Sequence, residues 1–209
     1  MAAPPAASHP ESPGAQPPPA PPQPSALAGQ GWLAFLILLL AAGLRALYWW
    51  LPELDGDMAM WGVQALDILD GRWHFLFSGE LFGGNLEAWL AAALFAVFGP
   101  GPRVLSLVPE LFSLALVGLT WRLARVELGP AGGLMAMAWA GLGPWFLMQQ
   151  SWEPKGAYIE VPFLALACFG LAARLLRQAA ADPQTGRSTA FWLGLLAGLG
   201  LWCHLLMLP

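Results

Sequence analysis

The sequence predicts an all-α membrane protein: a polytopic helical bundle with about five transmembrane helices and juxtamembrane helices in the first outer loop. Composition is the first observation, because 57% of the 209 residues are hydrophobic and only 11% are charged, whereas soluble domains carry about 25% charged residues. The second observation is a series of long apolar runs, each near the length that crosses a bilayer as a helix. A net charge of −4 without a basic patch gives no support to nucleic-acid binding.

The chain divides into a tail, an outer loop and the apolar runs. Residues 1–30 hold ten of the 20 prolines and predict a disordered, cytoplasmic Pro/Ala-rich tail. Residues 52–103 are the most polar part of the chain outside the tail. They predict an ordered outer loop, because they are rich in Trp, Phe and Leu. The predicted spans are residues 32–51, 104–121, 131–148, 158–173 and 190–208.

One apolar segment, Leu86–Phe98, is too short to be placed by length alone. Its 13 residues would form a helix of about 20 Å, against a hydrocarbon core of about 30 Å. If the segment does not span and the N-terminus is cytoplasmic, five basic residues are inside and three outside, as positive-inside bias prefers. Those inside are Arg122, Arg125, Arg174, Arg177 and Arg187, and those outside are Arg72, Arg103 and Lys155. We therefore expect an interfacial helix at Leu86–Phe98, with most acidic residues on the outer face.

Two outer segments carry candidate chemistry. Asp55 and Asp57 form a DxD pattern just after the first span, and their carboxylates could hold a metal or act as a general base. The alternative is that Asp57 caps a helix over residues 58–69. The second segment, residues 151–160, gathers one Lys and two Glu at a helix top. This predicts a functional cluster, the alternative being an interfacial Lys–Glu pair.

Two further polar residues lie within predicted spans. His204 is near the outer end of the last span, where a histidine forms either a helix–helix hydrogen bond or part of a site. Arg45 is near the outer end of the first span and is expected to extend its charged head to the membrane surface. Arginine outnumbers lysine eight to one, a bias typical of GC-rich bacterial genomes, so we expect a bacterial plasma membrane with the active face outside the cytoplasm.

Six short stretches, in order, resemble the GT-C membrane glycosyltransferases of the dolichyl-phosphate-mannose protein mannosyltransferase type, including the bacterial aminoarabinose transferases. The resemblance covers residues 32–209. The stretches are the acid-led helix from Asp57 to Gly71, Gly84–Trp89, Phe98-Gly99 with Arg103-Val104, Trp121–Arg125, Lys155–Glu160 and Leu201–His204. The sequence departs from the family at Met58, where members usually carry a second acid. Because the family core has at least seven spans, we expect residues 31–209 to be the N-terminal part of such a domain, inactive alone.

The resemblance implies transfer of a sugar from a polyprenyl-phosphate donor to a lipid, protein or glycan acceptor on the outer face, with inversion. It implies Asp57 as general base, with Glu160 as its partner from the second outer loop. Lys155 would stabilise the leaving phosphate, with Arg72 or Arg103 as substitutes for that role. The remaining candidate substrate-binding residues are Asp55, Glu87 and His204. No cofactor is certain, and a divalent cation is left open.

A different function class stays open at this point: a non-catalytic transporter or flippase fragment, or a membrane scaffold. A transporter would more often show internally repeated, Gly/Pro-broken spans around a midplane site. The acids of this sequence cluster at one face instead, and no internal repeat is visible. A scaffold does not require two acidic outer loops.

Overall fold

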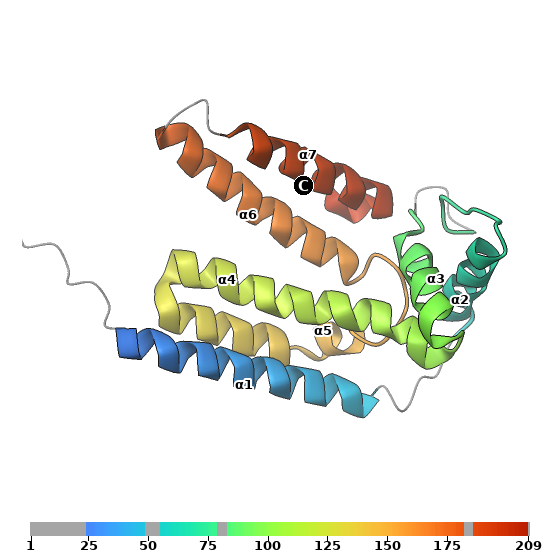
Figure 1. Cartoon of the computed structure of the whole chain (residues 1–209), viewed down its shortest axis with the longest axis horizontal. Helices are drawn as coiled ribbons and strands as arrows, with labels where there is room; N and C mark the ends of the chain where they lie inside the picture. Colours follow the sequence, from blue (N-terminus) through green and yellow to red (C-terminus); the bar gives the residue numbers. More distant parts are fainter. Residues whose placement is uncertain (1–23, 49–54, 79–82, 182–185, 209) are drawn as a thin grey trace, which may run out of the picture.

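The computed structural model, which describes residues 24–48, 55–78, 83–181 and 186–208, is all-helical in that part of the chain (Figure 1). Long helices lie side by side, and a pair of shorter helices gathers at one end of them. The elements are α1 (Pro24–Tyr48), α2 (Gly56–Leu69), α3 (Leu86–Phe98), α4 (Pro102–Leu142), α5 (Trp145–Gln149), α6 (Glu160–Ala181), α7 (Arg187–Cys203) and the 3₁₀ helix η1 (Leu205–Met207).

Three of these helices are long and apolar enough to cross a bilayer: residues 30–47 of α1, α4 and α6. Their outer faces expose large apolar side chains, for example Met135 (74%) and Phe169 (67%). Exposed apolar surface of this extent is unusual for a soluble monomer and is what lipid contact requires. The described part of the chain is all-helical, as predicted, and its three candidate membrane-spanning helices indicate a multi-pass membrane protein.

The longest helix, α4, is a hairpin rather than a single rod. Gly129 adopts φ 76°, ψ −178° in its middle, a backbone conformation that favours glycine. Pro130 follows, and a proline disfavours helical geometry in the residue before it. The chain reverses there, so that Gly133 of the second arm lies against Arg125 of the first, and Figure 1 shows the two arms side by side. The predicted break between residues 121 and 131 is thus present, but the first arm continues through most of the predicted connector.

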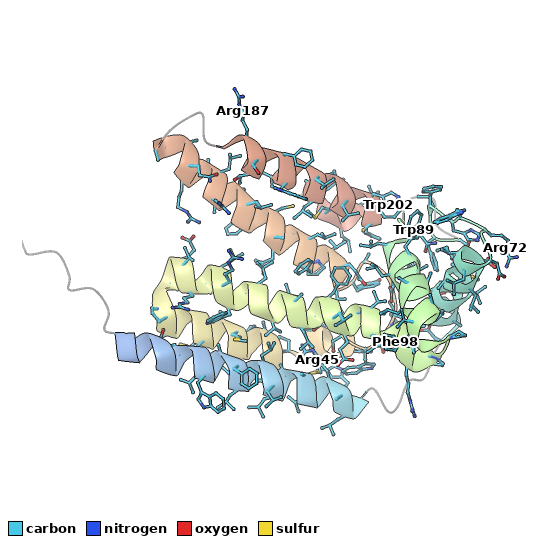
Figure 2. The ribbon with its side chains drawn as sticks, viewed as in Figure 1. Arg45, Arg72, Trp89, Phe98, Arg187 and Trp202 are labelled. Atoms are coloured by element: carbon cyan, nitrogen blue, oxygen red, sulfur yellow. The ribbon has the colours of Figure 1, made fainter. Side chains whose placement is uncertain are left out.

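Helix α1 packs against both arms of α4, and Arg45 lies between them (Figure 2). Arg45 is 1% exposed. Its Nε donates to Ser113 Oγ at 3.0 Å, and one terminal nitrogen donates to Gly141 O at 2.9 Å and to Ala41 O at 3.0 Å. The expectation that Arg45 extends to the membrane surface was wrong, because these acceptors satisfy its guanidinium inside the bundle.

Helices α6 and α7 form a second pair, and α6 packs against α4 through an edge-on contact between Phe112 and Phe163. The predicted spans differ from these helices in their bounds. Helix α6 continues to Ala181 instead of ending near residue 173, and α7 ends at Cys203 because the backbone of His204 is extended. Helix α4 ends at Leu142 instead of continuing to residue 148. Helix α1 begins at Pro24, inside the predicted tail, whose residues 1–23 lie outside the described part.

Helices α2 and α3 gather at one end of the long helices (Figure 1). Their shared core includes Trp61, Ala65, Ala91 and Phe95, packed against Leu105 at the start of α4. Helix α3 begins and ends at Leu86 and Phe98, the bounds that the sequence predicts for a separate short helix. This end of the molecule holds the polar residues of the two predicted site segments.

Candidate functional site

A cavity of about 460 Å³ lies where four parts of the chain meet. Its walls come from the N-terminus of α2, the segment before α3 (Phe77, Ser78 and Gly83), the turn over residues 155–158 and the C-terminal end of α7. The end of α7 is joined to the segment before α3 by a hydrogen bond from Gly84 N to Cys203 O (3.1 Å), and Figure 2 shows the neighbouring Trp202 at this end of α7. Four predicted site residues line the cavity: Asp55, Asp57, Lys155 and His204.

The two aspartates of the DxD pattern have different surroundings. Asp55 is the N-cap of α2, and its Oδ1 accepts the Met58 N–H at 2.8 Å. Asp57 stands in the first turn of the helix, so the alternative that Asp57 is the cap was wrong. The Asp57 side chain is exposed and makes no hydrogen bond or ion pair with any residue that the structure describes. Its carboxylate is thus available to a molecule in the cavity.

Lys155 supplies positive charge on the wall formed by the 155–158 turn. Its Nζ lies 3.0 Å from Glu153 Oε2 and 3.9 Å from Asp55 Oδ2. Hydrogen bonding to Glu153 raises the pKa of Lys155, with smaller contributions from the charges of Glu153 and Asp55. Gln149 donates to the other Glu153 oxygen at 3.0 Å. The expected Lys–Glu pair is present, and it holds a protonated ammonium at the cavity wall.

The turn that carries Lys155 has an unusual backbone. Gly156 has φ 57° and Ala157 has φ 63°, both in the left-handed region that side chains disfavour. Gly156 lies directly on the ring of Trp61, where a Cβ atom would overlap the ring. Trp61 is stacked in turn on Phe77, with ring centroids 4.2 Å apart. The turn is therefore in close contact with α2 and the cavity wall.

Glu87 and Glu160 lie behind this turn and do not line the cavity. Each is 2% exposed. One carboxylate oxygen of Glu87 accepts the Gly156 N–H. Burial raises the pKa of Glu87 well above its usual range, and the neighbouring charge of Glu160 raises it further. Sequence reasoning placed both glutamates among the site residues, whereas the structure puts them one layer behind the residues that meet the cavity.

His204 enters the cavity from the end of α7. Its Nδ1 accepts the Leu206 N–H at 3.0 Å. In the neutral imidazole the proton is then on Nε2, which makes that nitrogen a donor. His204 thus has one ring nitrogen, Nδ1, that holds the backbone of the following turn.

The structure does not bring Arg72 or Arg103 into the cavity. Arg72 pairs with Asp67, and with Asp70 at 3.1 Å, at the exposed tip labelled in Figure 2. Hydrogen bonding to Asp67 raises the pKa of Arg72. Arg103 is exposed at the start of α4. Lys155 is therefore the one cationic residue among those that line the cavity in the described part of the chain.

Sequence reasoning missed Trp61 and Tyr158 as cavity residues. Trp61 follows Asp57 by one helical turn, which places both on one face of α2, so helical spacing could have found it. Tyr158 follows Lys155 within the turn, where no periodicity applies. Both side chains add apolar surface beside the charged groups.

The sequence leaves a divalent cation open, and the described residues do not supply a donor set for one. Among the described residues, no three His, Cys, Asp or Glu side chains gather in a group that could hold a metal ion. Asp55 already uses one oxygen as a helix cap. We therefore derive no step through a metal.

Comparisons with protein families, with curated proteins and with solved structures find no match to this chain.

Proposed function

We propose that the protein is a membrane glycosyltransferase of the GT-C type, which transfers a sugar from a polyprenyl-phosphate donor to an acceptor outside the cytoplasm. The observation that carries the proposal is the convergence of Asp55, Asp57, Lys155 and His204 on one cavity of about 460 Å³. They come from segments separated by up to about 150 residues in the sequence. The Asp57 carboxylate, which has no partner among the described residues, lines the same cavity as Lys155, which suits a reaction that needs both a base and an anion-stabilising group.

In the proposed reaction, the Asp57 carboxylate removes the proton of the acceptor hydroxyl while its oxygen attacks the anomeric carbon. The new bond from acceptor oxygen to sugar forms as the bond from sugar to phosphate oxygen breaks. The bonding electron pair leaves with the polyprenyl phosphate, whose developing charge is stabilised by the Lys155 ammonium. A single displacement of this kind inverts the anomeric centre. His204 would form part of the wall against which the donor or acceptor lies.

The membrane arrangement that we propose has five crossings: α1, the two arms of α4, α6 and α7. The first arm of α4 and the second arm are separate crossings because the chain reverses at Gly129. Helices α2 and α3 then lie at the outer interface, beside the surface where a polyprenyl carrier would present its phosphate. A bacterial plasma membrane is part of this proposal.

Replacing Asp57 by Asn tests the proposed base. The complete gene product, in native membranes or micelles, is assayed for transfer from a polyprenyl-phosphate sugar. Because Asp57 is exposed and is not the helix cap, Asp57→Asn should fold normally and lower turnover by about 100- to 10,000-fold. Asp55→Asn should reduce turnover less, since Asn also caps helices.

Asp70→Asn is the matched control. Asp70 is an exposed acid at the other end of the same helix, away from the cavity, and its replacement should leave turnover unchanged. Near-normal turnover of Asp57→Asn with an inactive Asp55→Asn would assign the base to Asp55. Normal turnover of both variants would reject the cavity as the catalytic site, and an absence of any transfer by the wild-type protein would reject the proposed function.

If the protein is a transporter or a scaffold, no sugar transfer is expected in this experiment. Neither class needs a proton acceptor at Asp57, so neither predicts product formation that depends on this carboxylate.

A further inference from the structure

The turn over residues 155–158 requires support from outside itself. Gly156 and Ala157 are consecutive residues with positive φ, and Ala157 is the one non-glycine residue in the described part of the chain with that geometry. The left-handed conformation costs a residue with a side chain about 1–2 kcal/mol. Such a conformation persists when its surroundings hold it in place. The position of Lys155 at the cavity wall therefore depends on what holds this turn.

The structure shows the support directly. Gly156 is fixed on one side by the Trp61 ring and on the other by the carboxylate of Glu87, which accepts its N–H. Glu87 is 69 residues away in the sequence, in the first turn of α3. The contact thus ties the outer helix pair to the segment that carries Lys155.

Glu87 makes this contact from a buried position beside a second carboxyl group. Glu160 approaches from α6, and Cys203 is the titratable residue that α7 contributes to the same region. The second oxygen of each glutamate has no hydrogen-bond partner among the described residues. The nearby cation, Lys155, is paired with Glu153 and Asp55 instead. Two neighbouring carboxylate charges that are both buried repel each other, and Lys155 is paired elsewhere, so we infer that the two carboxyl groups retain a proton.

We propose that Glu87 is a positioning residue: together with Glu160 it forms a buried carboxyl pair that holds one proton, supports the 155–158 turn and keeps Lys155 at the cavity. Loss of that proton would place two like charges behind the turn and loosen it. The inference rests on the proposed function only for the role of Lys155 toward the leaving phosphate. The claim that Glu87 holds the turn that carries Lys155 does not depend on the reaction.

Lys155 is the single lysine among residues 1–209, so acetylation of the peptide that contains it reports directly on the turn. The complete gene product in detergent micelles is treated with acetic anhydride between pH 6 and 10. Mass spectrometry measures the acetylation rate of Lys155, divided by that of free N-acetyl-lysine amide under the same conditions. The ratio removes the ordinary pH dependence of amine reactivity.

Three variants separate the steps of the inference. In wild-type protein the ratio should be low and should rise about five- to tenfold between pH 6 and 10, which corresponds to about 1–1.4 kcal/mol of repulsion between the two ionised carboxylates. Glu87→Gln keeps an oxygen acceptor for Gly156 and cannot ionise, so its ratio should remain low throughout. Glu160→Gln should also remain low, because it removes the like charge. Glu87→Ala should show the high ratio at every pH.

Two results would overturn the inference. One is a Glu87→Ala ratio equal to that of wild-type protein, because Glu87 would then not hold the turn. The other is an alkaline rise that persists in Glu87→Gln, because the pair would then not be its source. If Glu87→Ala fails to fold, as judged by tryptophan fluorescence, the pH dependence of the acetylation ratio in wild type and in Glu87→Gln still tests the inference.

Transfer assays on the same variants distinguish this inference from the proposed function. If the function is correct, turnover of wild-type protein should decline at alkaline pH as the 155–158 turn loosens, and Glu87→Gln should show a smaller decline. A normal labelling pattern without any transfer by wild-type protein rejects the function and keeps the positioning role. Active wild-type protein with an unaffected Glu87→Ala rejects the positioning role and keeps the function.

Discussion

Replacing Arg45 by Met should destabilise the packing of α1 on α4. Methionine keeps a long, unbranched side chain but removes the charge and every donor. Two of the lost hydrogen bonds join helices, to Ser113 Oγ (3.0 Å) and to Gly141 O (2.9 Å). At about 1–2 kcal/mol for each interhelical hydrogen bond in a membrane protein, the free energy of unfolding should fall by about 2–4 kcal/mol.

The loss has a further electrostatic component that acts in the same direction. The Glu110 carboxylate on the first arm of α4 interacts with the Arg45 charge, and Arg45→Met leaves that carboxylate without its partner. A carboxylate retained without its partner inside a bundle is unfavourable. The decrease of about 2–4 kcal/mol in the free energy of unfolding, which counts hydrogen bonds alone, is therefore a lower bound.

Reversible unfolding in mixed micelles of dodecyl maltoside and SDS, followed by circular dichroism, measures this free energy. Arg122→Met is the matched control, since Arg122 is an exposed arginine on the same hairpin. A double-mutant cycle with Ser113→Ala should give a coupling energy of about 1 kcal/mol. If Arg45→Met unfolds within about 0.5 kcal/mol of the Arg122→Met control, a spread typical of surface substitutions, the reasoning from buried hydrogen bonds is refuted.

Three further predictions concern the outer end of the bundle. Because the pKa of Glu87 is raised above its unfolded value of 4.5, its contribution to stability is complete below that pH and is lost as pH rises through the folded-state pKa. Melting temperature should accordingly fall as pH rises above 4.5, and Glu87→Gln should flatten that fall. Gly156→Ala should lower the free energy of unfolding by about 1–3 kcal/mol more than Gly71→Ala does. Both glycines have positive φ, but of the two only Gly156 lies against an aromatic ring. Equal unfolding free energies of the two variants would contradict this. The topology is tested with Cys168 and Cys203 replaced by alanine. A cysteine introduced at Ser78 should react with an impermeant maleimide on intact cells, and one introduced at Arg125 should not. The reverse pattern would invert the proposed topology.

The sequence by itself determined the fold class and several helix boundaries, because these depend on local signals. Apolar runs of sufficient length predict membrane helices wherever they occur. The short segment Leu86–Phe98 is bounded by polar residues and glycines, and its helix begins and ends as predicted. The Gly129-Pro130 pair ends a helix through backbone sterics alone, so the break in α4 lies inside the predicted connector. Extending helices beyond their apolar runs, as in α6, depends on contacts that composition does not encode.

Tertiary structure alone decided which side chains meet. Asp55, Lys155 and His204 lie far apart in the sequence, and their convergence depends on how the helix pair at the end of the bundle docks. A sequence pattern can place a residue on an outer face but does not specify what lies one layer deeper, which is why Glu87 and Glu160 were expected beside Asp57. Burial is a property of the packed molecule, and it made these two carboxyls a support for the 155–158 turn and made Arg45 a link between helices.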